Sequence, residues 1–261
     1  MAIKSLILLT SLLGLSLAAD YCALPTCLDK HIACNNKGNF SENCPKDVRE
    51  VKIEPHHKLI LTLFNELRNN VAGGKIEGLP KAVRMAKMSW CEELSHLALL
   101  NVKTCESLPD KCRSTERFAY AGQNNAVFQY SGAETEYTDA EIIKEQIENW
   151  FAERSNASPE ILASFPEELP NKAVTKFTIA VAEKNTHVGC AAVRFSRDFY
   201  TTSYSPVTSH SNIVGQPVYT PGEKATTGCK NRYGAAYDYP NLCYAKEIYD
   251  NEKVIENTQT M

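Results

Sequence analysis

The sequence lacks the short motifs that mark the commonest enzyme classes. It has no Gly-x-Ser-x-Gly element, no His-Glu-x-x-His helix and no glycine-rich loop of the kind that holds phosphate groups. Paired Cys-x-x-Cys units, which structural zinc sites use, are also missing. No cluster of Lys and Arg stands out, and the formal net charge is only −3. A zinc ribbon and a nucleic-acid partner are therefore not expected.

Long hydrophobic runs are scarce, and the one that exists lies at the N-terminus. The basic Lys4 precedes an apolar stretch from Leu6 to Leu17, which ends at the small residues Ala18 and Ala19. This layout predicts a secretory signal peptide over residues 1–19 and a secreted, extracellular protein. The run is shorter than the about 20 apolar residues that cross a bilayer, so no transmembrane segment is expected.

Cysteine is abundant, and its distribution divides the chain. All ten cysteines follow the predicted signal peptide, and an even number in an exported chain predicts a disulfide framework. Residues 20–54 form a Cys-rich N-terminal extension with few large apolar residues, which cannot bury a core alone. Residues 55–220 carry the periodic apolar pattern and form the main domain. Residues 221–261 form a Cys-containing C-terminal extension with a polar tail.

Three helices are indicated in the main domain. Apolar residues recur at helical spacing over residues 59–71. Ser89 with Glu92, and Thr138 with Glu141, each match the Ser/Thr-x-x-Glu pattern of a capping box, so a helix is expected from each.

Two strands are expected after these helices. The short apolar runs 177–182 and 188–195 are separated by four polar residues, a spacing typical of a hairpin. Helices followed by adjacent strands, without regular alternation, predict an α+β sandwich in which helices cover a sheet.

Several segments resemble a known family in both sequence and order. They are Phe64–Ala72, Tyr120–Asn124, Trp150–Glu153, Phe177-Thr178 with His187–Cys190, and Asn212–Tyr219. Their order is similar to the signature blocks of the CAP superfamily of cysteine-rich secretory proteins. The start Asp20-Tyr21-Cys22 with His31–Asn36 resembles insect antigen 5 proteins of the fly type, which are venom allergen 5-like. The resemblance covers Asp20 to about Tyr244.

The resemblance implies a fold and a cysteine pairing. The fold is a CAP-type α-β-α sandwich, an antiparallel sheet between helical layers with a large cleft. The implied disulfides are Cys22–Cys34, Cys27–Cys112, Cys44–Cys105 and Cys229–Cys243.

Two cysteines depart from the family pattern. The family usually pairs the cysteine at Cys190 with one in the following strand, but residues 201–210 contain none. That segment is polar and includes Pro206, which predicts a poor core strand and a weak sheet edge. Either Cys91 and Cys190 form a bridge, or one or both remain free thiols.

The resemblance also maps a metal site. Many CAP proteins carry two histidines and two glutamates in the cleft, and these positions correspond to Phe64, Gln123, Glu153 and Lys176. Phe has no lone pair, Gln is neutral and Lys is a competing cation, so this tetrad is degenerate. No metal, no other cofactor and no catalytic residue are expected. A Lys176–Glu153 ion pair is expected to replace the metal if the two positions face each other.

The favoured functions are those of a non-enzymatic protein. The chain is expected to bind either a small hydrophobic ligand, such as a lipid or sterol, or an extracellular protein partner. The second case would make it a signalling or interaction factor of salivary or reproductive fluid. A hydrolase is the less favoured alternative. Asn39 and Asn156 each begin an Asn-x-Ser acceptor, so a glycoprotein is expected.

Overall fold

The computed structural model describes residues 19–169, 171–196 and 199–249. Most of the predicted signal peptide and the end of the polar tail lie outside these ranges. The α-helices are α1 (His57–Ala72), α2 (Glu92–Val102), α3 (Asp139–Ala152), α4 (Pro159–Ala163) and α5 (Thr175–Val181). The 3-10 helices are η1 (Leu28–Lys30), η2 (Glu54–His56) and η3 (Glu153–Asn156). The strands are β1 (Arg49–Glu50), β2 (Lys81–Ala82), β3 (Ser89–Trp90), β4 (Gly122–Gln123), β5 (Ala126–Tyr130), β6 (His187–Ser196), β7 (Tyr200–Thr208) and β8 (Pro221–Gly222).

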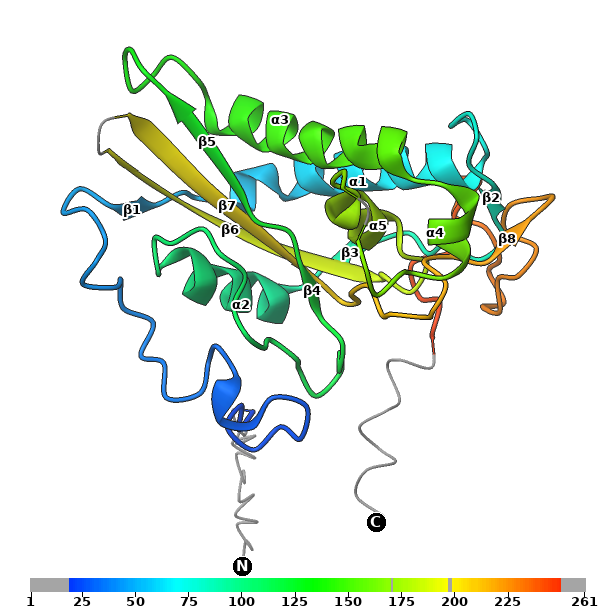
Figure 1. Cartoon of the computed structure of the whole chain (residues 1–261), viewed down its shortest axis with the longest axis horizontal. Coiled ribbons are helices and arrows are strands. Elements are labelled where there is room, and N and C mark those ends of the chain that lie inside the picture. The colour runs from blue at the N-terminus through cyan, green and yellow to red at the C-terminus, as the bar shows by residue number, and fades with distance from the viewer. Residues whose placement is uncertain (1–18, 170, 197–198, 250–261) are drawn as a thin grey trace, which may run out of the picture.

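The elements stack in three layers. The long antiparallel strands β6 and β7 form the middle of a six-stranded sheet, which β1, β3, β4 and β5 complete. Helices α1 and α3 cover one face and α2 covers the other (Figure 1). This arrangement confirms the α+β sandwich expected from the sequence. Within the described ranges, no helix is long and apolar enough to cross a membrane.

Alternation along β6 gives each face its own core. Cys190 and Ala192 join the apolar cluster that lies under α1 and α3, whereas Ala191 and Val193 join the cluster that lies under α2. Successive strand residues point to opposite faces, so one run of small apolar residues serves both layers. Position 189 requires glycine, because a β-carbon there would collide with the backbone at the start of α2.

The two predicted capping boxes have different outcomes. At α3, Thr138 Oγ1 accepts a hydrogen bond from Glu141 N (3.2 Å) and Glu141 Oε2 accepts one from Thr138 N (2.9 Å), which confirms the box. At α2 the prediction is wrong. Ser89 lies in β3, where it pairs in parallel with His187, and α2 begins only at Glu92. Sheet pairing takes precedence over the local capping pattern at this position.

The run 177–182 is also not a strand. It forms most of α5, whose buried apolar residues pack beneath α3 and α1. The hairpin partner of β6 is β7, so the predicted hairpin between 177–182 and 188–195 is wrong.

The weak edge predicted at residues 201–210 is likewise wrong, because β7 lies inside the sheet. Its polar side chains find partners: Ser205 Oγ accepts from Gln123 Nε2 (3.0 Å), and Ser203 Oγ bonds Ser107 Oγ (2.9 Å). Pro206 is tolerated because its carbonyl accepts a hydrogen bond from Asn124 N (3.1 Å). In an antiparallel strand the N–H and the carbonyl of one residue point to the same neighbouring strand. The N–H that Pro206 lacks would therefore face the gap between the end of β4 and the start of β5, where the sheet needs no further donor.

Four disulfides form, of which two join the N-terminal extension to the main domain and two lie within an extension. They are Cys22–Cys34, Cys27–Cys112, Cys44–Cys105 and Cys229–Cys243, the same pairs that the resemblance implies. The Cys27–Cys112 bond closes a loop of 85 residues, for which chain entropy alone gives about 4–5 kcal/mol of stabilisation.

The Cys91–Cys190 bridge does not form, and both residues are free cysteines. Cys190 belongs to the cluster under α1 and α3, while Cys91 packs against the cluster under α2. The two side chains therefore lie on opposite faces of the sheet. Burial raises the pKa of Cys190 to about 12 and also raises the pKa of Cys91, so both are protonated thiols at neutral pH.

Candidate functional site

The position of the first family histidine is occupied by a core residue. Phe64 on α1 is buried, with its ring centroid 6.5 Å from that of Trp150 and 6.1 Å from that of Phe151. Phe151 in turn makes an edge contact with Phe177 at 6.1 Å. Phe64 therefore extends an aromatic cluster instead of supplying a ligand atom to the cleft.

Gln123, at the position of the first glutamate, is saturated by protein partners. Its Nε2 donates to Asp110 Oδ2 (3.1 Å) and to Ser205 Oγ (3.0 Å), and its Oε1 accepts from Asp110 N (3.1 Å). The next residue, Asn124, donates from Nδ2 to the carbonyl of Lys176 (3.0 Å). This contact joins the residue after β4 to the start of α5, where Lys176 lies.

Glu153 and Lys176 meet, but not as an ion pair of side chains. Glu153 Oε2 accepts hydrogen bonds from the backbone N–H of Lys176 (2.9 Å) and of Phe177 (3.3 Å). These donors belong to the first turn of α5, whose N-cap residue, Val174, has no side-chain acceptor. Glu153 therefore caps α5, although it is distant in sequence. The predicted ion pair between the side chains of Lys176 and Glu153 is wrong, because Glu153 accepts from the backbone of α5 instead.

These four residues do not fit a divalent metal. Phe64 has no donor atom, the Gln123 amide is already satisfied and Glu153 is bonded to the backbone of α5. In the described part of the chain, no group of three or more His, Cys, Asp or Glu side chains is arranged to hold a metal ion. Phe64, Gln123 and Glu153 make structural contacts instead.

The capping role predicts a stability effect for Glu153→Ala. The substitution leaves two N–H groups of α5 without their acceptor and removes a negative charge from the helix N-terminus. We expect a loss of about 1–2 kcal/mol in the free energy of unfolding, measured by urea titration. Glu148→Ala, on the exposed face of α3, is the matched control and should change stability by less than about 0.5 kcal/mol. A Glu153→Ala protein as stable as the control would contradict the capping role.

A pocket of about 570 Å³ lies between α1, β3 and the C-terminal extension. Its apolar walls come from Leu61, Met88, Trp90 and Tyr239. At one end, Lys87 Nζ pairs with Asp238 Oδ2 (2.6 Å) and lies 5.3 Å from the centroid of the Tyr239 ring. The pocket therefore offers two aromatic faces beside a charged end, a combination that suits an amphipathic molecule.

Hydrogen bonds between distant segments position the walls of this pocket. Asn65 on α1 is buried and bonds both backbone groups of Met88, accepting from its N–H (2.8 Å) and donating to its carbonyl (3.1 Å). The extension is fixed to α1 where Asn241 N donates to Asn69 Oδ1 (2.9 Å). The His57 ring stacks on the outside of Trp90, with centroids 3.7 Å apart. The walls are therefore preorganised.

Sequence reasoning missed this pocket. Tyr239 and Asp238 belong to the extension that the sequence separates from the main domain, and nothing local indicates that it packs on α1. The available signal is the Cys229–Cys243 pair, which encloses this tyrosine-containing segment and positions it as one unit.

The two glycosylation acceptors differ in access. Asn39 is exposed, whereas Asn156 is half-buried and its Nδ2 donates to the carbonyl of Ala173 (2.7 Å). The amide nitrogen that would carry a glycan is thus occupied at Asn156. We expect secretion from a eukaryotic host to give one N-glycan, removed by Asn39→Gln and unaffected by Asn156→Gln, as measured by intact mass before and after glycosidase. A glycan on the Asn156 peptide would contradict this expectation.

Comparisons with known proteins agree with the geometry. The model of the cysteine-rich secretory protein family (CAP) matches residues 61–205. The antigen 5 like allergen Cul n 1 of Culicoides nubeculosus is 35% identical over 207 residues, 75% of this chain and 93% of that protein. Venom allergen-1 of Aedes aegypti is 31% identical over 238 residues, 90% of this chain and 91% of that protein. The crystal structure of NaASP2 with Zn2+ shares the fold at a TM-score of 0.58 and 20% identity, over 77% of this chain and 99% of that chain. The chain therefore belongs to the cysteine-rich secretory protein (CAP) family, as an insect antigen 5-related member.

Proposed function

We propose that this protein is a secreted, non-enzymatic binding protein for a small amphipathic ligand. The observation that carries the proposal is the preorganised pocket between α1 and the C-terminal extension. Its volume of about 570 Å³ falls within the roughly 300–1,000 Å³ typical of small-molecule sites. An apolar body would lie between Trp90 and Tyr239, and an acidic group would meet Lys58 at the rim, since Lys87 is paired with Asp238.

A binding role without catalysis is supported by the fate of the family cleft. A metal-dependent reaction needs several free donor atoms around one point, whereas Phe64 lies in the core and Glu153 caps α5. Secretion is supported by the signal-like N-terminus and the four disulfides, which form in oxidising compartments. The division into an N-terminal extension (20–54), a main domain (55–220) and a C-terminal extension (221–261) is part of this proposal, with Cys27–Cys112 and Cys44–Cys105 joining the first two parts.

The two tryptophans make the pocket directly measurable. Trp90 lines it, whereas Trp150 is buried in the core against Tyr204. We expect 1-anilinonaphthalene-8-sulfonate, an anionic aromatic probe, to quench tryptophan emission of the full chain saturably. Trp90→Phe should abolish the quenching, because it removes the tryptophan that reports on the pocket. Tyr239→Ala should weaken binding by about fivefold or more, because it removes one aromatic wall.

The control is Tyr237→Ala. Tyr237 is two residues from Tyr239 but fully exposed and outside the pocket. Its loss should leave probe binding unchanged. Equal effects of the two tyrosine variants, or quenching that survives Trp90→Phe, would overturn the pocket as the ligand site.

A second candidate function is recognition of an extracellular protein. Tyr233 and Tyr237 are exposed on the same disulfide-bonded C-terminal extension. The Cζ atom of Arg232 lies 4.8 Å from the centroid of the Tyr233 ring. Exposed Tyr and Arg on a rigid support are typical of protein-binding surfaces. Crosslinking in the source fluid should then retain a partner with the wild-type chain and lose it with Tyr237→Ala, the variant that keeps the pocket intact.

A further inference from the structure

The loop that joins β5 to α3 places four acidic residues around one tyrosine. Glu134 and Glu136 lie three and one positions before Tyr137, and Asp139 and Glu141 lie two and four positions after it. Residues 118–143 contain no Lys or Arg, and residues 130–144 contain no Cys and no Asn. The tyrosine therefore lies in a strongly acidic stretch, without a disulfide or an N-glycan acceptor in the neighbouring sequence.

The backbone of this loop presents the segment at one end of the molecule. Gly132 adopts a φ of 120°, in the left-handed region that favours glycine. Glu136 N then donates to the carbonyl of Ala133 (3.0 Å), which closes a turn just before the tyrosine. Figure 1 shows the loop projecting beyond the end of β5, on the far side of the molecule from α4 and β8. The turn is therefore open to another protein.

The ring of Tyr137 is held while its hydroxyl is left free. The ring makes edge contacts with Phe128 (centroids 5.1 Å apart) and with Tyr130 (5.0 Å). Tyr130 uses its own hydroxyl to donate to the carbonyl of Glu134 (2.6 Å). The hydroxyl of Tyr137 makes no hydrogen bond to any residue that the structure describes. Its phenolic oxygen therefore keeps its lone pairs for a reaction partner.

The carboxylates before the tyrosine are available for recognition. Glu136 is exposed and has no Lys or Arg partner among the described residues. Glu134 pairs with Arg49, and the two side chains of this pair are 44% and 48% exposed. Exposed ion pairs contribute little to stability, so a basic enzyme surface can displace Arg49. The two acidic residues after the tyrosine are engaged at the start of α3.

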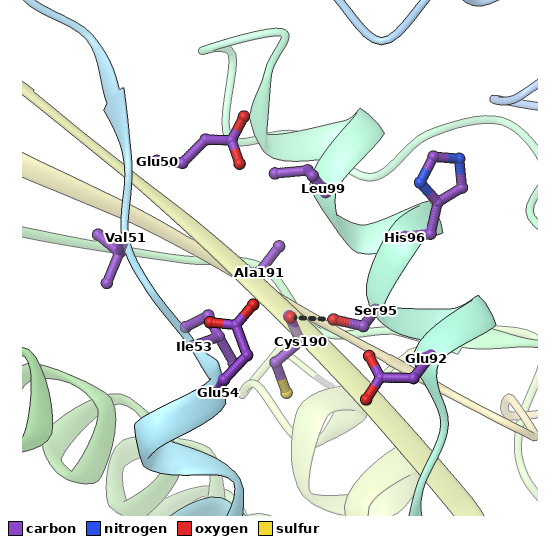
Figure 2. Close-up of a pocket in the computed structure, with 10 residues that line it drawn as sticks. All are labelled: Glu50, Val51, Ile53, Glu54, Glu92, Ser95, His96, Leu99, Cys190 and Ala191. Carbon is purple, nitrogen blue, oxygen red and sulfur yellow. Dashed lines mark hydrogen bonds between the residues drawn. The ribbon is translucent and has the colours of Figure 1, made fainter.

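A second acidic surface lacks a comparable hydroxyl. Glutamates line a groove between η2 and α2, where Figure 2 shows Glu54 and Glu92 near Ser95. Ser95 carries the one hydroxyl among the side chains drawn there, and it donates to the carbonyl of Cys190 (2.7 Å). That groove is a solvated acidic face. The β5–α3 loop differs because an unbonded hydroxyl lies among its carboxylates.

We propose that the phenolic oxygen of Tyr137 is sulfated in the secretory pathway, an inference that rests on the secretion proposed above. Sulfotransferases of that pathway modify tyrosines flanked by acidic residues, above all by one directly before the tyrosine, which is the position of Glu136. The phenolic oxygen attacks the sulfur of a nucleotide phosphosulfate. An O–S bond forms, the bond from sulfur to the bridging phosphate oxygen breaks, and the nucleotide leaves with that oxygen. The phenolic proton passes to a base of the enzyme.

The test incubates the folded full chain, with its disulfides intact, with a purified tyrosylprotein sulfotransferase and a radiolabelled phosphosulfate donor. We expect one sulfuryl group per chain, located on the Tyr137 peptide by tandem mass spectrometry. Tyr137→Phe should abolish the incorporation. Tyr237→Phe is the matched control, because Tyr237 is fully exposed but has Asp238 as its only acidic neighbour within five residues. This control should incorporate the label as the wild-type chain does.

A second pair of variants tests recognition by charge. Glu136→Gln should slow the incorporation about fivefold or more, because it removes the carboxylate directly before the tyrosine while keeping the shape of the side chain. Glu148→Gln, at an exposed position on α3, should leave the rate unchanged. Because the Tyr137 hydroxyl has no protein partner, the thermal midpoints of the modified chain and of these variants should equal that of the unmodified wild-type chain.

The chain secreted from insect cells should carry the same mass increase, lost when chlorate blocks synthesis of the donor. The proposal is wrong if only the reduced, unfolded chain is modified in vitro, if Tyr137→Phe keeps the label, or if the exported chain is unmodified. It is also wrong if the added group is a phosphoryl group, of nearly the same mass, which alkaline phosphatase removes. A chain that is modified in vitro but retained in the cell would contradict the secretion itself, and quenching of Trp90 reports on the ligand pocket separately.

Discussion

Arg68→Met is expected to destabilise the protein by about 3–5 kcal/mol, the largest effect of any single substitution considered. Arg68 on α1 is completely buried and makes five hydrogen bonds to main-chain carbonyls. Two go to Ala86, and one each goes to Ala180, Ala182 and Asn185. One side chain thus joins α1 to the segment before β3, to the end of α5 and to the turn before β6.

The size of the effect follows from what the substitution leaves behind. Methionine fills a similar volume but donates nothing, so four buried carbonyls lose their partner at about 1–3 kcal/mol each before relaxation. Burial lowers the pKa of Arg68 to about 10, so the guanidinium is still charged at neutral pH. Urea unfolding with the disulfides intact measures the loss. The exposed Arg232→Met is the control, with a change below about 0.5 kcal/mol. A loss under about 1 kcal/mol for Arg68→Met would contradict this role.

Stability is expected to fall as the pH is lowered from about 6.5 to about 4. Burial lowers the pKa of His187 to about 4, with a contribution from Arg117. Burial likewise lowers the pKa of His210 to about 4, with a contribution from Lys184. Between these values and the ordinary pKa of 6.5, the unfolded chain binds more protons than the folded chain. The stability from these histidines is therefore complete above pH 6.5 and is lost as the pH falls towards 4.

Each histidine contributes up to about 3 kcal/mol to this change, from about 1.4 kcal/mol per pKa unit. The measurement is the urea midpoint at pH 7.0 and at pH 4.5. Carboxylates titrate in the same region, so the informative quantity is the difference between proteins. His210→Gln should show a smaller loss between the two pH values than the wild-type chain. An identical loss in both proteins would show that His210 does not titrate in this window.

Local signals in the sequence predict local structure well. The capping box of Thr138 and Glu141 is complete within four residues, and it forms as predicted. The α5 segment is different, because two distant residues stabilise it: Glu153 binds its first N–H groups and Arg68 binds its last carbonyls. Neither contact can be predicted from residues 177–182 themselves, because their apolar run indicates a strand. Long-range hydrogen bonds thus decide the conformation of this short helix.

The sequence also does not reveal which face of the sheet a side chain occupies. The cysteine count leaves a Cys91–Cys190 bridge open, but the layers of the fold place the two side chains on opposite faces of the sheet. The tetrad positions could be assigned from the family pattern, and the loss of donors at Phe64 is evident in the sequence. That Glu153 caps a helix, and that Tyr239 completes a pocket with Trp90, depends on contacts between distant segments.

We propose that the four tetrad positions have a structural role in this protein and that ligands bind elsewhere. Native mass spectrometry tests this proposal most directly, with the full chain and its variants expressed in a eukaryotic host, incubated in the source fluid, repurified and supplemented with Zn2+. We predict no retained zinc, and an added mass of one small organic molecule that is lost on denaturation and absent from Tyr239→Ala. One zinc ion retained per chain, and lost in Glu153→Ala, would contradict the account.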